Sequence, residues 1–223
     1  AEVQPLLENG LSLAAINAPE AVVASGSPAA IDQLARRLSG RGVETRPLVT
    51  SHAFHSVALD SVLPAFEAAL RRMHLAPPER RWISNLTGTW IRPEDAVAPD
   101  YWVRHLRHTV RFTQAMAAAL QRPGRVVVEV GPGQTLSPLV AAANGPHRAR
   151  AVIASAKKPK DAADDTLVAS AAFGALWAHG VDIDWSKVRP TGGRRVSLPT
   201  YAFDKQRHWI EPGHGVAAAA SEA

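Results

Sequence analysis

Residues 126–133 have the sequence VVVEVGPG and give the clearest fold signal in this chain of 223 residues. A β-branched run bounded by glycines is the pattern of a fully buried strand in a parallel sheet. Gly131 and Gly133 then turn the chain into an apolar segment, 136–143, which we predict to be a helix. A strand, a glycine turn and a helix in succession are typical of α/β domains. The turn lacks the spacing of the phosphate-binding glycine loops, so its predicted role is structural.

An earlier part of the chain predicts a smaller mixed unit. Residues 11–16 and 21–25 are apolar runs that end at turn residues, and we predict a strand for each. Ser27-Pro28 predicts the start of a helix, which Gly40 ends. Residues 43–49 are predicted to form a third strand. The β-β-α-β order is typical of a small ferredoxin-like sheet with a helix on one face.

Other segments carry helical or extended patterns. Asp100 is the predicted N-cap of one helix, and residues 196–209 are predicted to be extended. The tail, 213–223, consists mainly of small residues and is predicted to be disordered. Helical spacing of apolar residues is found in 59–70, 101–106, 112–120 and 167–178.

Composition excludes several classes of protein. The chain is 46% hydrophobic and 20% charged, as in ordinary soluble proteins, and has no apolar run long enough to span a membrane. Its first residues lack the basic-then-apolar pattern of a signal peptide, so none is expected. It has no Cys, which excludes disulfides, thiolate metal sites and a cysteine nucleophile, and which fits a reducing cytoplasm. The net charge is +5, but the arginines are scattered and no nucleic-acid-binding module is present. We therefore expect no nucleic acid partner, although a basic patch could receive an acidic protein.

Residues 50–56, TSHAFHS, are the main candidate for chemistry. His52 and His55 flank Phe54, and the motif is predicted to lie on a turn between a strand and a helix. Catalytic groups are often held on such turns, and histidine exchanges a proton readily near neutral pH. By themselves, two neighbouring histidines also fit surface or structural positions. The spacing of the nine His matches no metal-binding motif, so we expect no metal.

From about residue 11 to residue 211, the chain resembles the acyltransferase domain of modular type I polyketide synthases, related to malonyl-CoA:acyl carrier protein transacylases. Several segments carry the resemblance in the same order. They are LAAINAP (13–19) with VVASG (22–26), SHAFHS (51–56), YWVR (101–104) through VRF (110–112), VEVGPG (128–133) with Leu136, and LPTYAF (198–203) to RHW (207–209).

The resemblance implies a fold of the α/β class, with α+β character in its small part. A ferredoxin-like subdomain would be inserted in an α/β-hydrolase-like acyltransferase domain, of which only the C-terminal part is present. The implied domains are the small subdomain at 11–70, part of the large subdomain at 71–153, a post-acyltransferase linker at 154–212, and the tail at 213–223.

The resemblance also implies a two-step acyl transfer through a serine ester. The serine would attack malonyl-CoA, and the malonyl group would pass to the phosphopantetheine thiol of an acyl carrier protein. A serine hydroxyl needs a base, and the resemblance assigns that role to His55. His105 would orient His55 through its backbone carbonyl, which would accept the proton on Nδ1 of His55 and leave Nε2 facing the serine. The alternative is that His105 is an ordinary residue of a surface helix. The chain itself is expected to bind no cofactor.

His52 and Phe54 occupy the positions that this family uses to distinguish malonyl from methylmalonyl groups. The His-Ala-Phe-His form goes with malonyl, because Phe54 would fill the space that a methyl substituent needs. Discrimination by one methyl group is worth about 1–3 kcal/mol, so a preference is expected rather than an absolute choice. The alternative is that His52 and Phe54 only shape the turn.

No G-x-S-x-G elbow occurs in the sequence, so the serine is expected outside this chain. The family's carboxylate-binding arginine is also missing. The expected partners are the serine-bearing half of the domain, a ketosynthase domain, the carrier protein and malonyl-CoA, with no membrane. Two other functions stay open. One is a docking or linker piece without catalysis, and the other is an α/β-hydrolase fragment, which would hydrolyse esters rather than transfer acyl groups to a thiol.

Overall fold

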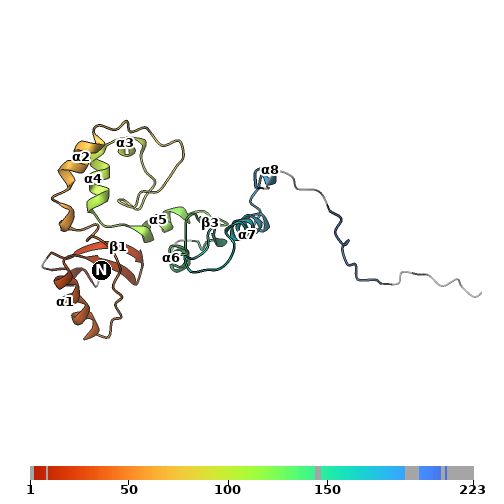
Figure 1. Ribbon diagram of the computed structural model, residues 1–223, viewed down its shortest axis with the longest axis horizontal. Coiled ribbons are helices and arrows are strands. Elements are labelled where there is room, and N and C mark those ends of the chain that lie inside the picture. Colours follow the sequence, from red (N-terminus) through yellow and green to blue (C-terminus); the bar gives the residue numbers. More distant parts are fainter. Residues whose placement is uncertain (1–2, 9, 144–146, 189–195, 207–208, 210–223) are drawn as a thin grey trace, which may run out of the picture. The chain divides into compact units, whose positions relative to one another are not determined.

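The computed structural model describes residues 3–8, 10–143, 147–188, 196–206 and 209. The chain divides into two units, Ala1–Ile183 and Asp184–Ala223. The first unit contains, in order, η1 (Gln4–Leu6), β1 (Ser12–Ala18), β2 (Ala21–Ser25), α1 (Pro28–Ser39), η2 (Val57–Leu59), α2 (Leu63–Leu70), α3 (Pro93–Ala96), α4 (Pro99–Arg107), α5 (Phe112–Ala119), β3 (Val126–Glu129), α6 (Ser137–Ala142), β4 (Ala151–Ala154) and α7 (Asp165–Ala178) (Figure 1).

The predicted hairpin is confirmed. β1 and β2 pair in antiparallel register from Ser12 opposite Ser25 to Ala18 opposite Ala21. The other side of β1 binds the segment that leads into α5, where Val110 exchanges two backbone hydrogen bonds of 2.8 Å with β1. Thr109 adds a hydrogen bond of 2.6 Å from its hydroxyl to the carbonyl of Leu13. The hairpin is therefore attached to a segment almost a hundred residues further along the chain.

The predicted third strand is wrong. α1 begins as expected, with the Ser27 hydroxyl accepting from the amide of Ala30 at 3.3 Å. Residues 43–49, however, adopt no strand, and among the described residues the backbone groups of 44–49 make no backbone hydrogen bond to one another or to a neighbour. A strand needs a partner, and part of the free edge of β1 is already taken by Val110. Val49 is consequently fully exposed.

The strand–turn–helix unit is confirmed at the glycine turn. β3 pairs with β4 in parallel from Val126 opposite Ala151 to Glu129 opposite Ala154. β3 is only half-buried, and not fully as predicted, because β4 is its one neighbour among the described strands. Gly131 and Gly133 have φ of 144° and 93°, where a side chain would be strained.

A carboxylate fills the amide-rich side of this turn. Glu129 accepts hydrogen bonds of 2.8–2.9 Å from the backbone amides of Thr135, Leu136 and Ser137, and one of 2.5 Å from the Ser137 hydroxyl. These bonds, led by the one from the Leu136 amide, lower the pKa of Glu129. The amides that a phosphate would need are already occupied, which agrees with a structural role for the turn.

An aromatic cluster holds α4 in place. Tyr101 is 1% exposed and donates a 2.6 Å hydrogen bond to the hydroxyl of Ser84, which is 0% exposed. Trp82 stacks on Trp102, with ring centroids 5.8 Å apart. Figure 1 shows α4 side by side with α2. α4 begins at Pro99, so the predicted cap residue Asp100 lies inside its first turn, and that prediction is wrong.

The last elements follow the predictions in part. α7 confirms the predicted helix at 167–178 and begins slightly earlier, at Asp165, with the Asp164 carboxylate accepting from the Leu167 amide at 3.0 Å. The second unit contains α8 (Trp185–Val188), and residues 196–206 adopt neither helix nor strand. The predicted disordered tail lies outside the described residues, and the predicted domain boundaries stay predictions. None of the described helices has the length and apolarity to cross a membrane.

Candidate active site

The predicted turn, 50–56, is built by short-range hydrogen bonds. The carbonyl of His52 accepts from the Thr50 hydroxyl at 3.2 Å and from the Phe54 amide at 3.0 Å. His55 follows with φ of 56°, and among the described residues no other non-glycine has a positive φ. The left-handed conformation costs a side-chain-bearing residue about 1–2 kcal/mol. Strain of this kind gathers at functional sites, where the surrounding structure has to maintain it.

Ser56 makes hydrogen bonds on both sides of the strained residue. Its side chain is 0% exposed. The hydroxyl donates to the carbonyl of Ala53 at 2.6 Å and accepts from the amide of Ala58 at 3.2 Å, which caps η2. The backbone is therefore held before and after His55. The sequence indicated a turn here but did not single out Ser56. The one signal that could have done so is that serine is a favourable N-cap residue, here for the helical turn 57–59.

The structure brings His55 and His105 together. Their ring centroids lie 6.3 Å apart, with the rings nearly perpendicular at 88°. His105 also stacks on Tyr101 at 6.2 Å and meets Trp102 edge to face at 6.1 Å. The His55 ring is partly exposed, but its Nδ1 atom is buried. Since Nδ1 is covered, a group arriving from outside could exchange a proton with this ring only at Nε2.

The expected hydrogen bond between these residues is not formed. Nδ1 of His55 has no hydrogen-bond partner in the part of the chain that the structure describes, whereas the carbonyl of His105 was predicted to accept from it. The rings meet edge to face instead. The His105 carbonyl lies in the last turn of α4, where carbonyl groups have no partner within the helix, and it is therefore still available as an acceptor.

Burial, and after it the charge of His55, lower the pKa of His105 below its ordinary value. The side chain of His105 is therefore neutral at pH 7. A neutral neighbour does not oppose the positive charge that His55 would gain on accepting a proton. The two histidines are thus suited to different tasks, one to proton transfer and the other to packing.

An ion pair makes a second connection between the turn and α4. Asp60, directly after η2, accepts a short hydrogen bond from the guanidinium of Arg107, at the end of α4. The two side chains come from segments far apart in the sequence. Charge pattern alone gave no signal for this pair, because both segments contain several other charged residues.

His52 and Phe54 lie on the exposed side of the turn. Their ring centroids are 6.0 Å apart and tilted by 58°, and Phe54 is 45% exposed. His52 is held by a 3.0 Å hydrogen bond between its Nδ1 and the hydroxyl of Ser51. The two residues therefore form one exposed aromatic surface beside the partly exposed His55.

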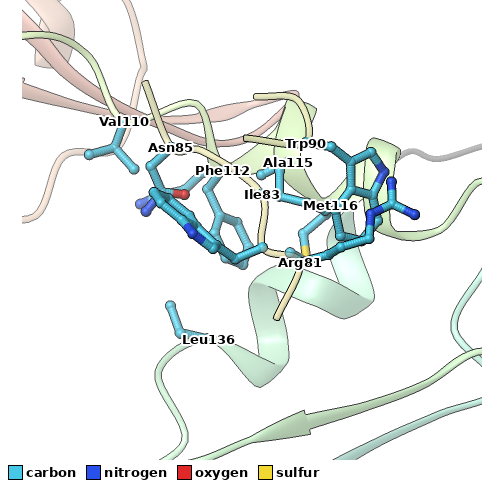
Figure 2. Close-up of a pocket in the computed structure, with 11 residues that line it drawn as sticks. Arg81, Ile83, Asn85, Trp90, Val110, Phe112, Ala115, Met116 and Leu136 are labelled. Atoms are coloured by element: carbon cyan, nitrogen blue, oxygen red, sulfur yellow. The ribbon is translucent and has the colours of Figure 1, made fainter. Parts of the chain in front are cut away.

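A pocket of about 460 Å³ lies elsewhere in the first unit, and none of residues 50–56 lines it (Figure 2). Its wall is mainly apolar and includes Trp82, Phe112 and Met116. The guanidinium of Arg81 lies 4.4 Å from the ring centroid of Trp90. The pocket is separate from the histidine pair and contains no group suited to proton transfer. In the described parts of the chain, no three His, Asp or Glu side chains gather closely enough to hold a metal ion.

The chain matches known proteins over most of its length. The family model described as "Acyl transferase domain" matches residues 2–172. A phenolphthiocerol/phthiocerol polyketide synthase of Mycobacterium tuberculosis is 36% identical over 222 residues, which are 100% of this chain and 15% of that protein. The acyl transferase domain of SpnD, solved in complex with 2-(pent-4-yn-1-yl)malonyl, matches with a TM-score of 0.76 and 39% identity over 80% of this chain and 44% of that one.

A further solved relative is the acyltransferase domain from the second module of the salinomycin polyketide synthase. It matches with a TM-score of 0.74 and 32% identity, over 89% of this chain and 46% of that one. The chain thus spans less than half of these solved domains and a smaller part of the curated synthase. The match to the family model covers the hairpin, the histidine pair and the glycine turn, and the chain belongs to the acyl transferase domain family.

Proposed function

We propose that this chain is the base-bearing part of an acyltransferase domain of a polyketide synthase, and that His55 is the base. The observation that carries the proposal is the state of His55. A partly exposed imidazole sits on a strained turn, with Nδ1 buried and a neutral His105 beside it. A strained backbone at a partly exposed imidazole costs stability, which is expected of a group held ready for proton transfer.

In the proposed mechanism, Nε2 of His55 accepts the proton of a serine hydroxyl as its oxygen attacks the thioester carbonyl of malonyl-CoA. The imidazolium then protonates the leaving CoA thiolate, and a malonyl ester of the serine remains. In the second half of the cycle, His55 takes the proton of a carrier protein's phosphopantetheine thiol. The thiolate attacks the ester, and the serine oxygen recovers the proton from His55.

The serine has to come from outside residues 1–223, because they contain no G-x-S-x-G elbow. A preceding segment of the same polypeptide or a second chain would supply it. The proposed partners are therefore a serine-bearing part of the domain, the acyl carrier protein and the adjacent ketosynthase domain. The similarity to a much longer polyketide synthase supports an assembly of this kind.

The proposed acyl donor is malonyl-CoA. The SpnD domain was solved with a substituted malonyl group, which supports a malonyl-type substrate for this chain as well. His52 and Phe54 would form the wall beside the α-carbon of that group. Phe54 is a bulky side chain where a serine would leave more room, and it therefore favours malonyl over methylmalonyl.

A second candidate function, docking without catalysis, is favoured by the second unit. Tyr201 and Phe203 are 77% and 75% exposed, although their rings contact each other at 4.9 Å. Exposed aromatic side chains on a segment without helix or strand are suited to packing on a neighbouring domain. This role is compatible with catalysis by the first unit.

The test uses the complete acyltransferase domain, including the serine-bearing segment. Transfer of malonyl from malonyl-CoA to carrier protein is measured for the wild type and for His55→Ala, with the exposed His74→Ala as the matched control. Loss of a general base lowers the rate about 10²–10⁴-fold, and this is the effect expected for His55→Ala. Loading by His55→Ala at the wild-type rate would refute the role of His55. Release of free malonate instead of transfer to the thiol would favour a hydrolase.

A further inference from the structure

We propose that Ser56 is a positioning residue, which holds the His55 imidazole in the orientation needed for acyl transfer. The inference rests on the proposed role of His55 as the base. It assigns to Ser56 no contact with the substrate and no share in proton transfer. Its effect on the reaction would pass through His55 alone.

Ser56 cannot be the nucleophilic serine. Its side chain is 0% exposed, so no acyl group can reach it. Its proton is engaged, because the hydroxyl donates to the carbonyl of Ala53 at 2.6 Å. Its oxygen also accepts from the amide of Ala58 at 3.2 Å. A buried hydroxyl that already donates one hydrogen bond and accepts another stabilises the backbone around it and is not free to react.

The two hydrogen bonds lie on either side of His55. Ala53 precedes it and Ala58 follows it, so the hydroxyl joins backbone groups across the strained residue. His55 has φ of 56°, a conformation that a histidine rarely adopts without support. The site needs a small side chain that both donates and accepts, and the Ser56 hydroxyl does both from a single oxygen atom. An alanine would leave the Ala53 carbonyl and the Ala58 amide without this partner.

The direction of the His55 ring depends on that backbone. A change of φ at His55 moves its Cβ, and the ring moves with it relative to His105. Nδ1 of His55 has no hydrogen-bond partner in the described part of the chain. No hydrogen bond at that atom would therefore keep the ring in place if the backbone moved. Misplacement of a reacting group by about 1 Å can lower a rate about 100-fold. The Ser56 hydrogen bonds are therefore expected to affect the rate of catalysis, and not only stability.

The experiment compares four forms of the complete domain: wild type, Ser56→Ala, His55→Ala and the double variant. Ser61→Ala is the matched control, because Ser61 is exposed, lies close in the sequence, and makes no side-chain hydrogen bond to another described residue. Malonyl transfer is measured under steady-state conditions, well below the unfolding temperature of each form. Ser56→Cys, which fills nearly the same volume but forms weaker hydrogen bonds, replaces Ser56→Ala if the latter does not fold.

Ser56→Ala is expected to lower kcat about 10- to 100-fold with little change in KM, and Ser61→Ala to leave both unchanged. In the His55→Ala background, Ser56→Ala should have no further effect, because it acts through the imidazole. A wild-type kcat for Ser56→Ala, or an equal loss in both backgrounds, would overturn the inference. If His55→Ala alone transfers malonyl at the wild-type rate, the proposed function fails first and the inference fails with it.

Discussion

The left-handed backbone of His55 predicts a stability difference between two variants that both lack its imidazole. His55→Gly and His55→Ala both remove the imidazole, so the loss of the ring contact with His105 is common to them. They differ in backbone freedom at φ of 56°. Glycine adopts this conformation without steric penalty, whereas alanine retains the Cβ that makes it unfavourable. We therefore expect the glycine variant to be the more stable of the two.

The magnitude follows from two opposing effects. A Cβ in the left-handed region costs about 1–2 kcal/mol. Glycine loses more conformational freedom on folding than alanine, which costs about 0.5–1 kcal/mol. The midpoints of the two ranges leave a balance of about 0.75 kcal/mol in favour of His55→Gly over His55→Ala. Such a difference raises the unfolding temperature of a domain of about 150–250 residues by roughly 2–3 °C, and that of the larger complete domain by less.

The assay is urea unfolding of the complete domain, with thermal unfolding as the second measurement. Gln33 in α1 is exposed and helical and gives a matched control of opposite sign. There, the glycine variant should be less stable than the alanine variant by about 1 kcal/mol. An alanine variant at position 55 that is as stable as the glycine variant, or more stable, would show that His55 is not strained.

Three further predictions concern the specificity surface, the buried histidine and the glycine turn. Phe54→Ser should raise the loading of methylmalonyl relative to malonyl about tenfold in a competition assay, and an unchanged ratio would exclude Phe54 as a determinant. The pKa of His105 is lowered in the folded domain, so the neutral imidazole contributes stability at high pH. The domain should lose this contribution as the pH falls from about 6.5, the pKa of the unfolded state, through the folded pKa. The free energy of unfolding of His105→Asn should therefore depend less steeply on pH over that range than that of the wild type. Parallel curves for the two proteins would contradict this. Glu129 has a lowered pKa, so its ionised form contributes stability above pH 4.5 that is lost as the pH falls through the folded pKa. Glu129→Gln should therefore destabilise the domain at pH 7 and less so in acid, and an equal effect at both pH values would contradict the role given to the carboxylate.

Local patterns in the sequence were sufficient for several elements. The β-branched run before Gly131 predicted β3, and Ser27-Pro28 predicted the start of α1, because each depends on residues close in the chain. The strand predicted for 43–49 failed for the opposite reason. An extended apolar segment becomes a strand only beside a partner, and no local pattern shows that Val110 already binds part of β1.

The candidate site was predictable where the resemblance supplied residues and unpredictable where packing decides the geometry. The resemblance pointed to His55 and His105, and the structure brings their rings together. The expected hydrogen bond to Nδ1 is absent among the described residues, and no local pattern in the sequence determines how α4 packs against the turn. The role of Ser56 and the Asp60–Arg107 pair were missed, since both become visible only in three dimensions.

The most direct test of the central claim is the first chemical step. The complete domain is mixed with malonyl-CoA, quenched at short times, and measured by intact-mass spectrometry for the malonyl ester of its serine. The wild type should form the ester rapidly, and His55→Gln should form it about 10²–10⁴-fold more slowly. An ester that forms in His55→Gln at the wild-type rate would contradict the assignment of His55 as the base.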